Sequence, residues 1–350
     1  MTDIPAPLRL HLDGAALVAN WRMMAAISGD AACGAAVKAD GYGLGARAVV
    51  QRLAAAGCRD FFVATWAEAE GLADLVAAQG IALSVLHGVR AEDMAAAIAG
   101  PARPVLNTAA QLARWRESGG GRACDVMVDS GMHRLGVSVA EIADGLLDGL
   151  TIETLMSHLA CADEDSSMNE RQRAAFAELA GRTGARRMSL ANSAGVALGQ
   201  GYCFDLTRPG IALYGGVPSA ALAGRIAQVA FPQAQILQRR HVPAGGAVGY
   251  NATWIAPHDT EVAILNLGYA DGYLRGFSGT GMASAGGAAL PVIGRISMDL
   301  TAIDVSAARD LAEGDWVTID YALPAASVAS GLSQYELLTG LGRRFARVWG

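Results

Sequence analysis

Lys38 is the residue whose type and position in this sequence most directly suggest covalent chemistry. It ends the apolar run AAVK at residues 35–38, which has the composition of a buried β-strand. A lysine beside apolar side chains is partly dehydrated, and dehydration lowers the pKa of its amine because the charged form is disfavoured. The uncharged amine is the nucleophile that a Schiff base requires. A strand-end lysine is also compatible with a surface residue whose aliphatic stem lies along apolar neighbours.

Other polar residues also lie at or near the ends of apolar runs. Two glycine-containing tracts, SAG at 193–195 and RPGIALYGG at 208–216, offer backbone N–H groups of the kind that bind phosphate, although ordinary turns have the same composition. His158, which lies at the end of one such run, is compatible with either a structural or a catalytic role. The polar residues are Arg134, His158, Asn192, Ser193 and Arg208.

Eight short apolar runs between residues 33 and 214 are the elements that must position these side chains. They are CGAAV at 33, FFVAT at 61, IALSVL at 81, RPVLN at 103, CDVMVD at 124, IETLMS at 152, RRMSLA at 186 and GIALYG at 210. Segments with helical spacing separate them, which predicts a closed (β/α)₈ barrel of the TIM type. Such barrels carry their sites where the strands end. An open doubly wound sheet is less favoured, because no glycine-rich dinucleotide turn follows the first run.

The pattern changes after about residue 226. Short strands separated by Gly and Pro follow, such as TEVAILNLGYADG, LPVIGRISMDLTAIDV and GDWVTIDYA. We therefore predict an α/β fold with a barrel domain over residues 1–226 and a smaller C-terminal β domain over residues 227–350. Roughly the first 10 residues are candidates to pack with the β domain.

Composition excludes several classes of partner. The 350 residues include 27 Lys and Arg against 33 Asp and Glu, a formal net charge of −6, so nucleic acid is not expected as a partner. The five cysteines form no Cys-x-x-Cys pair, and we expect buried thiols in the cytoplasm and no metal site. The N-terminus lacks a signal-peptide pattern, and the uncharged stretch 276–294 is rich in Gly and Ser, so we expect no membrane association.

The segment AAVKADGYGLG at 35–45 resembles the cofactor-binding signature of alanine racemases, in which the lysine carries pyridoxal 5'-phosphate. Further motifs resembling that family follow in order along nearly the whole chain: DVMVDSGMHRLGV at 125, MSHLACADED at 156, SLANSAG at 189, FDLTRPGIALYGG at 204, NLGYADG at 266, GRISMDL at 294 and SQYELLT at 333. The resemblance implies racemisation of L- and D-alanine, with D-alanine supplied for cell-wall synthesis. It also implies a cytoplasmic homodimer with shared active sites and an amino acid as substrate.

The resemblance also implies roles for individual residues. Lys38 is implied to carry the cofactor and to be one of two catalytic bases, with Tyr269 of the partner subunit as the other. The residues implied to hold the cofactor phosphate are Tyr42, Ser193, Gly210, Ile211 and Tyr335. Those implied to surround its ring are His158, Asn192 and Arg208, the last facing the pyridine nitrogen. Arg134 and Met298 are implied to meet the substrate carboxylate, and Asp299 to lie along the entry.

Two bases suit racemisation, because the α-proton leaves one face of the carbon and a proton returns to the other. Arg134 and His158 are expected to favour the phenolate of Tyr269. Arg208 stays protonated and can only donate a hydrogen bond, which disfavours a decarboxylase on the same barrel. A racemase of broader specificity, accepting serine or basic amino acids, remains an alternative. A non-enzymatic carrier of the cofactor is disfavoured, because it would not need Tyr269.

One position departs from the family pattern. Many alanine racemases carry a carbamylated lysine seven residues before the arginine matched by Arg134, and Met127 occupies that position here. Methionine supplies no negative charge to orient Arg134. An unpaired guanidinium in a partly dehydrated barrel mouth is unfavourable, so we expect either a bound chloride or a nearby carboxylate in its place.

Overall fold

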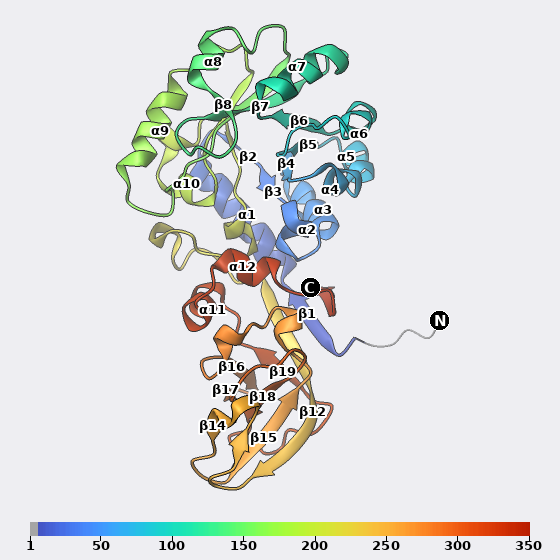
Figure 1. The fold of residues 1–350 in the computed structure, drawn as a ribbon, viewed down its shortest axis with the longest axis vertical. Coiled ribbons are helices and arrows are strands. Elements are labelled where there is room, and N and C mark those ends of the chain that lie inside the picture. Colours follow the sequence, from blue (N-terminus) through green and yellow to red (C-terminus); the bar gives the residue numbers. More distant parts are fainter. Residues whose placement is uncertain (1–5) are drawn as a thin grey trace. The chain divides into compact units, whose positions relative to one another are not determined.

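The computed structural model describes residues 6–350, which form two compact units. The first unit is the continuous stretch Leu17–Ala227, and the second combines the described residues up to Ala16 with Gln228–Gly350. Figure 1 shows the first unit as strands surrounded by helices and the second as a sheet with two short helices. The predicted fold class, an α/β barrel followed by a smaller β domain, is confirmed.

Parallel strands form the wall of the first unit, which we call the barrel unit. They run in the order β10-β9-β7-β6-β5-β4-β3, and β11 pairs in parallel with β2, the segment that precedes β3. Backbone hydrogen bonds from Asp205 N to Met188 O and from Arg208 N to Ala191 O link the β11 segment to the β10 segment and so connect the two ends of the sheet. The strands are β2 (Ala32–Cys33), β3 (Ala35–Ala36), β4 (Asp60–Val63), β5 (Ala82–Val85), β6 (Arg103–Leu106), β7 (Cys124–Asp129), β9 (Ile152–Met156), β10 (Arg187–Ser189) and β11 (Leu206–Thr207), with β8 (Val137–Ser138) beside β7.

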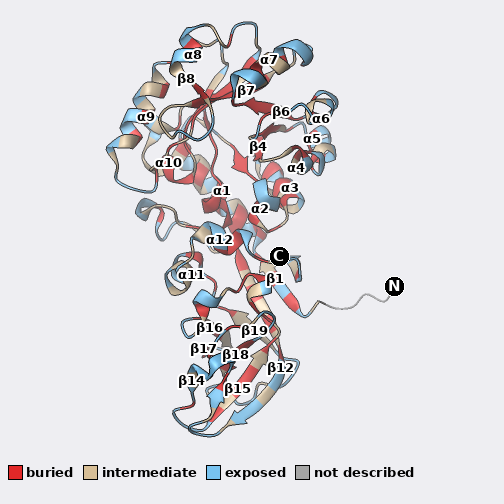
Figure 2. Ribbon diagram, viewed as in Figure 1, coloured by how far each residue is buried: buried red, intermediate tan, exposed pale blue. Residues whose placement is uncertain are grey.

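Helices between the strands cover the outer face of the barrel, so the strands are buried on both sides. All four residues of β4 and the first five of β7 are buried, and Figure 2 shows these strands in red. The helices are α1 (Gly14–Ser28), α3 (Ala46–Ala56), α4 (Trp66–Glu70), α5 (Ala73–Gln79), α6 (Met94–Ala99), α7 (Ala109–Ser118), α8 (Val139–Ala143), α9 (Ser167–Ala177) and α10 (Ser193–Ala197), with 3₁₀ helices η1 (Gln200–Tyr202), η2 (Ile211–Tyr214) and η3 (Ala220–Leu222). The segment labelled α2 (Lys38–Tyr42) is a left-handed turn rather than a regular helix.

The last predicted strand of the barrel was wrong. The run GIALYG at 210 does not form a strand: Ile211–Tyr214 is the 3₁₀ helix η2, and the strand is Leu206–Thr207. The physical reason is that the N–H groups of Gly210 and Ala212 donate to the Ser193 hydroxyl instead of to a neighbouring strand. Arg208 therefore directly follows β11, the last strand of the barrel.

The second unit, the β unit, is built around one mostly antiparallel sheet in the order β15-β18-β17-β16-β19-β12-β1-β20. Strand β12 also pairs with β15, beyond a bulge between Ile236 and Gln238, so one long strand joins both parts of the sheet. Strand β1 lies between β12 and β20 and is parallel to β20. The strands are β1 (Leu8–Leu12), β12 (Ala230–Val242), β15 (Thr260–Leu265), β16 (Met282–Ala285), β17 (Ala288–Ile293), β18 (Thr301–Asp304), β19 (Trp316–Ile319) and β20 (Phe345–Trp349), with the separate pair β13 (Ala247–Val248) and β14 (Trp254–Ile255).

Helices α11 (Leu323–Ser330) and α12 (Gln334–Thr339) follow β19. The loops of the β unit contain the 3₁₀ helices η4 (Tyr250–Ala252), η5 (Tyr269–Asp271) and η6 (Arg275–Phe277). Within residues 6–350, no helix combines the length and the apolar composition needed to cross a bilayer.

Candidate active site

The polar residues singled out in the barrel unit all follow the carboxyl ends of its strands. Lys38 follows β3, Arg134 follows β7, His158 follows β9, Asn192 and Ser193 follow β10, and Arg208 follows β11. Parallel strands of a barrel end on the same side, so these side chains share one mouth. Lys38, Arg134 and Arg208 all act electrostatically on His158, as expected for groups gathered there.

Lys38 is the only lysine in the chain. Part of its surface faces solvent, but the walls of the mouth remove enough hydration to lower the pKa of its amine. The positive charges of Arg134 and Arg208 lower this pKa further, whereas the carboxylate of Glu68 raises it. A larger share of the amine is therefore uncharged at neutral pH, as a nucleophile or base requires.

Arg208 is buried among uncharged acceptors. Its guanidinium donates to Ser157 O at 2.6 Å, to Leu190 O at 3.4 Å and to the Ser189 hydroxyl. Burial lowers the pKa of Arg208 to about 10, so the side chain still carries its charge at neutral pH. The mouth therefore contains a fixed cation that can donate hydrogen bonds but cannot accept them.

His158 differs from its neighbours because it is uncharged. Burial, followed by the like charges of Arg208, Arg134 and Lys38, lowers the pKa of its imidazole to about 3. A neutral His158 adds no positive charge that could favour a phenolate. A neutral imidazole remains suited to stacking against a flat ring.

A cluster of hydrogen-bonding groups suited to an anion lies between the ends of β10 and β11. The Gly210 N–H at 2.9 Å and the Ala212 N–H at 3.3 Å both donate to the Ser193 hydroxyl, so the backbone turns its donors toward one oxygen position. Asn192 caps α10 by accepting from Gly195 N at 2.8 Å, which holds Ser193 in place. Ile211 begins the 3₁₀ helix next to these donors.

Tyr42 lies against the Gly210 side of this cluster. A Cβ on Gly210 would overlap the Tyr42 hydroxyl, so only glycine allows this approach. The Tyr42 ring stacks on Tyr214 with centroids 4.6 Å apart, and the buried Tyr214 hydroxyl donates to Ala36 O at 2.8 Å. A phenol and converging N–H donors form a donor set that fits a phosphate.

Arg134 lines a hollow of about 340 Å³ together with Asn107 and Asp129. Within the described residues, no carboxylate comes within ion-pair distance of Arg134: Asp129 instead accepts from Gly131 N and His133 N at 2.9 and 3.0 Å. Met127 is buried, as expected for an apolar replacement. The structure thus provides no support for a compensating carboxylate.

The β unit holds Tyr269 close to Met298. The Tyr269 N–H donates to Ser297 O at 3.0 Å, and the Ala270 N–H donates to Met298 O at 2.9 Å. A Cβ on Gly268 would overlap the Met298 backbone, so glycine is required where the two loops meet. These contacts bring two predicted site residues together.

A buried carboxylate links the same turn to Asp299. Asp271 accepts from Gly268 N at 3.0 Å and from Arg344 Nε at 2.6 Å, and Arg344 donates from Nη1 to Asp299 Oδ1 at 2.8 Å. Because Asp271 is fully buried, this network fixes the turn that carries Tyr269.

Arg275 and Tyr335 are two further polar side chains of the β unit. The guanidinium of Arg275 lies 5.1 Å from the centroid of the Tyr269 ring, a cation–π contact that orients the ring. Tyr335 lies in α12 and is 45% exposed.

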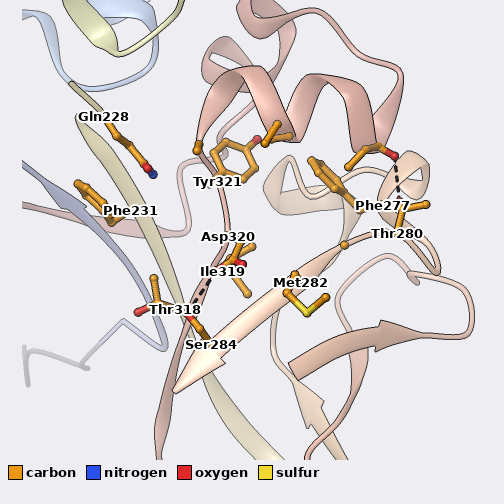
Figure 3. Close-up of a pocket in the computed structure, with 15 residues that line it drawn as sticks. Gln228, Phe231, Phe277, Thr280, Met282, Ser284, Thr318, Ile319, Asp320 and Tyr321 are labelled. Carbon is orange, nitrogen blue, oxygen red and sulfur yellow. Dashed lines mark hydrogen bonds between the residues drawn. The ribbon is translucent and has the colours of Figure 1, made fainter. Parts of the chain in front are cut away.

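A separate hollow of about 500 Å³ lies in the β unit between α11, β16 and β19 (Figure 3). Its walls include Phe231, Phe277, Met282, Tyr321 and the alanines on one face of α11. None of the residues predicted for the site lines it, so this hollow is distinct from the candidate site.

Several residues of the site gave no signal in the sequence analysis. Ser157 and Leu190 hold Arg208 through backbone carbonyls, which any residue type possesses. Asp271 and Arg344 lie far apart in sequence, so their ion pair is visible only in the fold. Glu68 belongs to a capping box that the sequence TWAE at 65–68 makes recognisable, but its contact with Ala39 N is visible only in the fold.

The chain matches two family models end to end: "Alanine racemase, N-terminal domain" over residues 12–218 and "Alanine racemase, C-terminal domain" over residues 229–349. It is 42% identical to an alanine racemase of Acidiphilium cryptum, with 97% of this chain and 98% of the relative covered. It is 40% identical to a catabolic alanine racemase of Agrobacterium fabrum, over 97% and 91% of the two chains. A crystal structure of alanine racemase from Bartonella henselae with covalently bound pyridoxal phosphate is 33% identical and superposes with a TM-score of 0.89, covering 99% of this chain and 100% of that chain. By fold, by the order of its motifs and by these similarities, the chain belongs to the alanine racemase family.

Proposed function

We propose that the chain interconverts L- and D-alanine with pyridoxal phosphate attached to Lys38. The observation that carries the proposal is the single barrel mouth that a partly dehydrated lysine, a buried donor-only arginine and a cluster of groups suited to phosphate share. When bound, the cofactor makes the α-proton of an attached amino acid acidic by spreading the negative charge that develops.

Arg208 sets how far that charge spreads. Because its guanidinium is protonated and its other partners are neutral acceptors, it offers only N–H donors toward the mouth. We assign it to the ring nitrogen of the cofactor, which it keeps as an acceptor without a proton. An unprotonated ring withdraws electrons less strongly, which favours return of the proton over side reactions such as decarboxylation.

Two bases on opposite faces of the substrate carry the proton. We assign one role to Lys38 and the other to Tyr269 contributed by a second copy of the chain, so the functional unit is a homodimer with shared sites. Arg275 orients the phenol ring, and the Asp271–Arg344 network fixes its turn. Tyr42, Ser193, Gly210, Ile211 and Tyr335 are assigned to the phosphate, His158 and Asn192 to the surroundings of the ring, Arg134 and Met298 to the substrate carboxylate, and Asp299 to the entry.

The test is a panel of L-amino acids incubated with the purified protein, with the D-products measured by chiral chromatography. We expect D-alanine to form fastest. Equal rates with serine or basic amino acids would indicate a racemase of broader specificity instead, and carbon dioxide without D-product would indicate a decarboxylase.

We place the reaction in the cytoplasm, where it would supply D-alanine for cell-wall synthesis. Because relatives are named both catabolic and biosynthetic, we expect growth of a deletion strain with and without D-alanine to decide the physiological direction.

Gly210→Ala is expected to weaken the binding of pyridoxal phosphate about ten- to a hundredfold, because the added methyl overlaps the Tyr42 hydroxyl. Titration of the cofactor-free protein, followed by absorbance, measures the change. Gly201→Ala is the matched control, since a Cβ at Gly201 meets open space. Equal affinities for the two variants would show that the cluster at Gly210 does not hold the phosphate.

Racemisation is expected to depend on chloride, because Arg134 lacks a carboxylate partner in the described chain and Met127 cannot provide one. Exchange of chloride for a large, weakly coordinating anion at constant ionic strength should lower the rate, and added chloride should restore it along a saturation curve. Met127→Lys, once carbamylated, should remove this dependence. A wild-type rate that does not change with chloride concentration would refute the idea that chloride replaces the missing negative charge beside Arg134.

A further inference from the structure

The segment that carries Lys38 has an unusual backbone. The four residues after Lys38 all have left-handed conformations, with φ of 54° at Ala39, 53° at Asp40, 64° at Gly41 and 56° at Tyr42. A Cβ makes this conformation unfavourable, and several such residues in succession are rare. The turn must therefore be held by its surroundings.

Part of that support is local. Gly43 N donates to Ala39 O at 2.8 Å, and the Asp40 carboxylate accepts from Ala46 N at 2.8 Å. The N–H of Ala39, the peptide group directly after Lys38, does not join these bonds. This N–H instead donates outside the turn, to Glu68 Oε1 at 2.7 Å.

Glu68 serves two segments at once. It is the third residue of α4 and forms a capping box with Thr65, in which its Oε2 accepts from Ala64 N at 2.7 Å and from Thr65 N at 3.2 Å. One carboxylate oxygen thus completes the start of α4, while the other binds the Lys38 turn from a position 29 residues away in sequence.

The capping box of α8 provides a direct comparison. It joins Ser138 to Glu141 on a helix of the same length, five residues. Within the described residues, the side-chain hydrogen bonds of Glu141 all return to Ser138 through Oε2. A carboxylate that only caps its helix therefore needs one oxygen, and the second contact of Glu68 is additional.

We propose that Glu68 is a positioning residue for the reaction: its carboxylate locks the left-handed turn after Lys38 and so fixes the direction of the Lys38 amine. This inference rests on the proposed function in that Lys38 binds the cofactor. The negative charge of Glu68 also raises the pKa of the Lys38 amine, whereas the positive charges of Arg134 and Arg208 lower it. Its removal should therefore loosen the turn and make the amine less basic.

The experiment compares Glu68→Ala and Glu68→Gln with Glu141→Ala and Glu141→Gln. Since Lys38 is the only lysine, reductive methylation with isotope-labelled formaldehyde marks one side-chain amine, and its NMR titration in the cofactor-free protein reports the pKa of that site. Both Glu68 variants should lower this pKa relative to the wild type. Neither Glu141 variant should change it.

The second readout is the affinity for pyridoxal phosphate. We expect Glu68→Ala to weaken it about tenfold, because the Ala39 N–H loses its charged acceptor. Glu68→Gln should recover part of the loss, since its amide oxygen can still accept from one segment. Far-ultraviolet circular dichroism checks folding, and if Glu68→Ala fails to fold, Glu68→Gln alone carries the comparison.

The inference is overturned if the Glu68 variants show the same pKa of the Lys38 amine and the same cofactor affinity as the Glu141 variants. Glu68 would then be an ordinary helix cap. Failure of the proposed function is recognised separately, because then the wild type itself would carry no cofactor on Lys38 after borohydride reduction. If Lys38→Ala loses the attachment while the Glu68 variants match the controls, only the inference fails.

Discussion

Lys38→Ala should abolish covalent attachment of pyridoxal phosphate and lower the racemisation rate by about 10⁴-fold or more, because both the attachment point and one base are removed. The chain contains no other lysine that could take its place. Absorbance of the bound cofactor and mass spectrometry after borohydride reduction measure the attachment, and chiral chromatography measures the rate. In the wild type, the reduced cofactor should be found on the peptide that contains Lys38.

Arg52→Ala serves as a control for the loss of a positive side chain elsewhere in the barrel unit, since Arg52 lies on α3 and is not part of the site. It should retain the attached cofactor. Retention of near wild-type turnover by Lys38→Ala would remove Lys38 from the mechanism.

Tyr269→Phe should lower the rate by about 10²- to 10⁴-fold while leaving the cofactor attached, because the phenylalanine keeps the ring but has no group to exchange a proton. If Tyr269 acts on the partner's site, an equal mixture of Lys38→Ala and Tyr269→Phe chains should regain activity on subunit exchange. Random pairing makes half of the dimers mixed, and each mixed dimer has one complete site of two. The mixture should therefore reach about a quarter of the wild-type rate.

The control mixes Lys38→Ala with the double variant Lys38→Ala, Tyr269→Phe, a pair that cannot assemble a complete site in any combination. Native mass spectrometry confirms that exchange has occurred. Mixed dimers that remain as inactive as the parent variants would place both bases within one chain.

The sequence predicted the barrel strands where an apolar run is short and closely bounded, as in FFVAT at 61, which overlaps β4. GIALYG at 210 has the same composition but forms a 3₁₀ helix. The difference depends on the Ser193 hydroxyl, which receives the N–H groups of Gly210 and Ala212 from a distant part of the chain. No local periodicity records such a contact, so apolar runs beside glycine remain ambiguous.

The candidate site was predictable where it depends on residue type and unpredictable where it depends on the backbone. Lys38 and Arg208 stand out by their chemistry and by family motifs. The left-handed turn at Ala39 and Asp40 does not, because neither residue type favours positive φ strongly enough to predict it. The neutral state of His158 likewise follows from burial and three neighbouring charges that only the fold assembles.

The pairing of β1 with β20 constrains the order in which the protein can fold during synthesis. Leu8–Leu12 aligns with Phe345–Trp349, so β1 pairs with a strand that is made roughly 300 residues after it. The barrel unit is a continuous stretch and can form its contacts while synthesis proceeds, whereas the β unit has contacts of very long sequence separation. One edge of β1 therefore stays without its partner strand until residues 345–349 have been made, and a ribosome stalled before residue 345 would leave that edge available for aggregation.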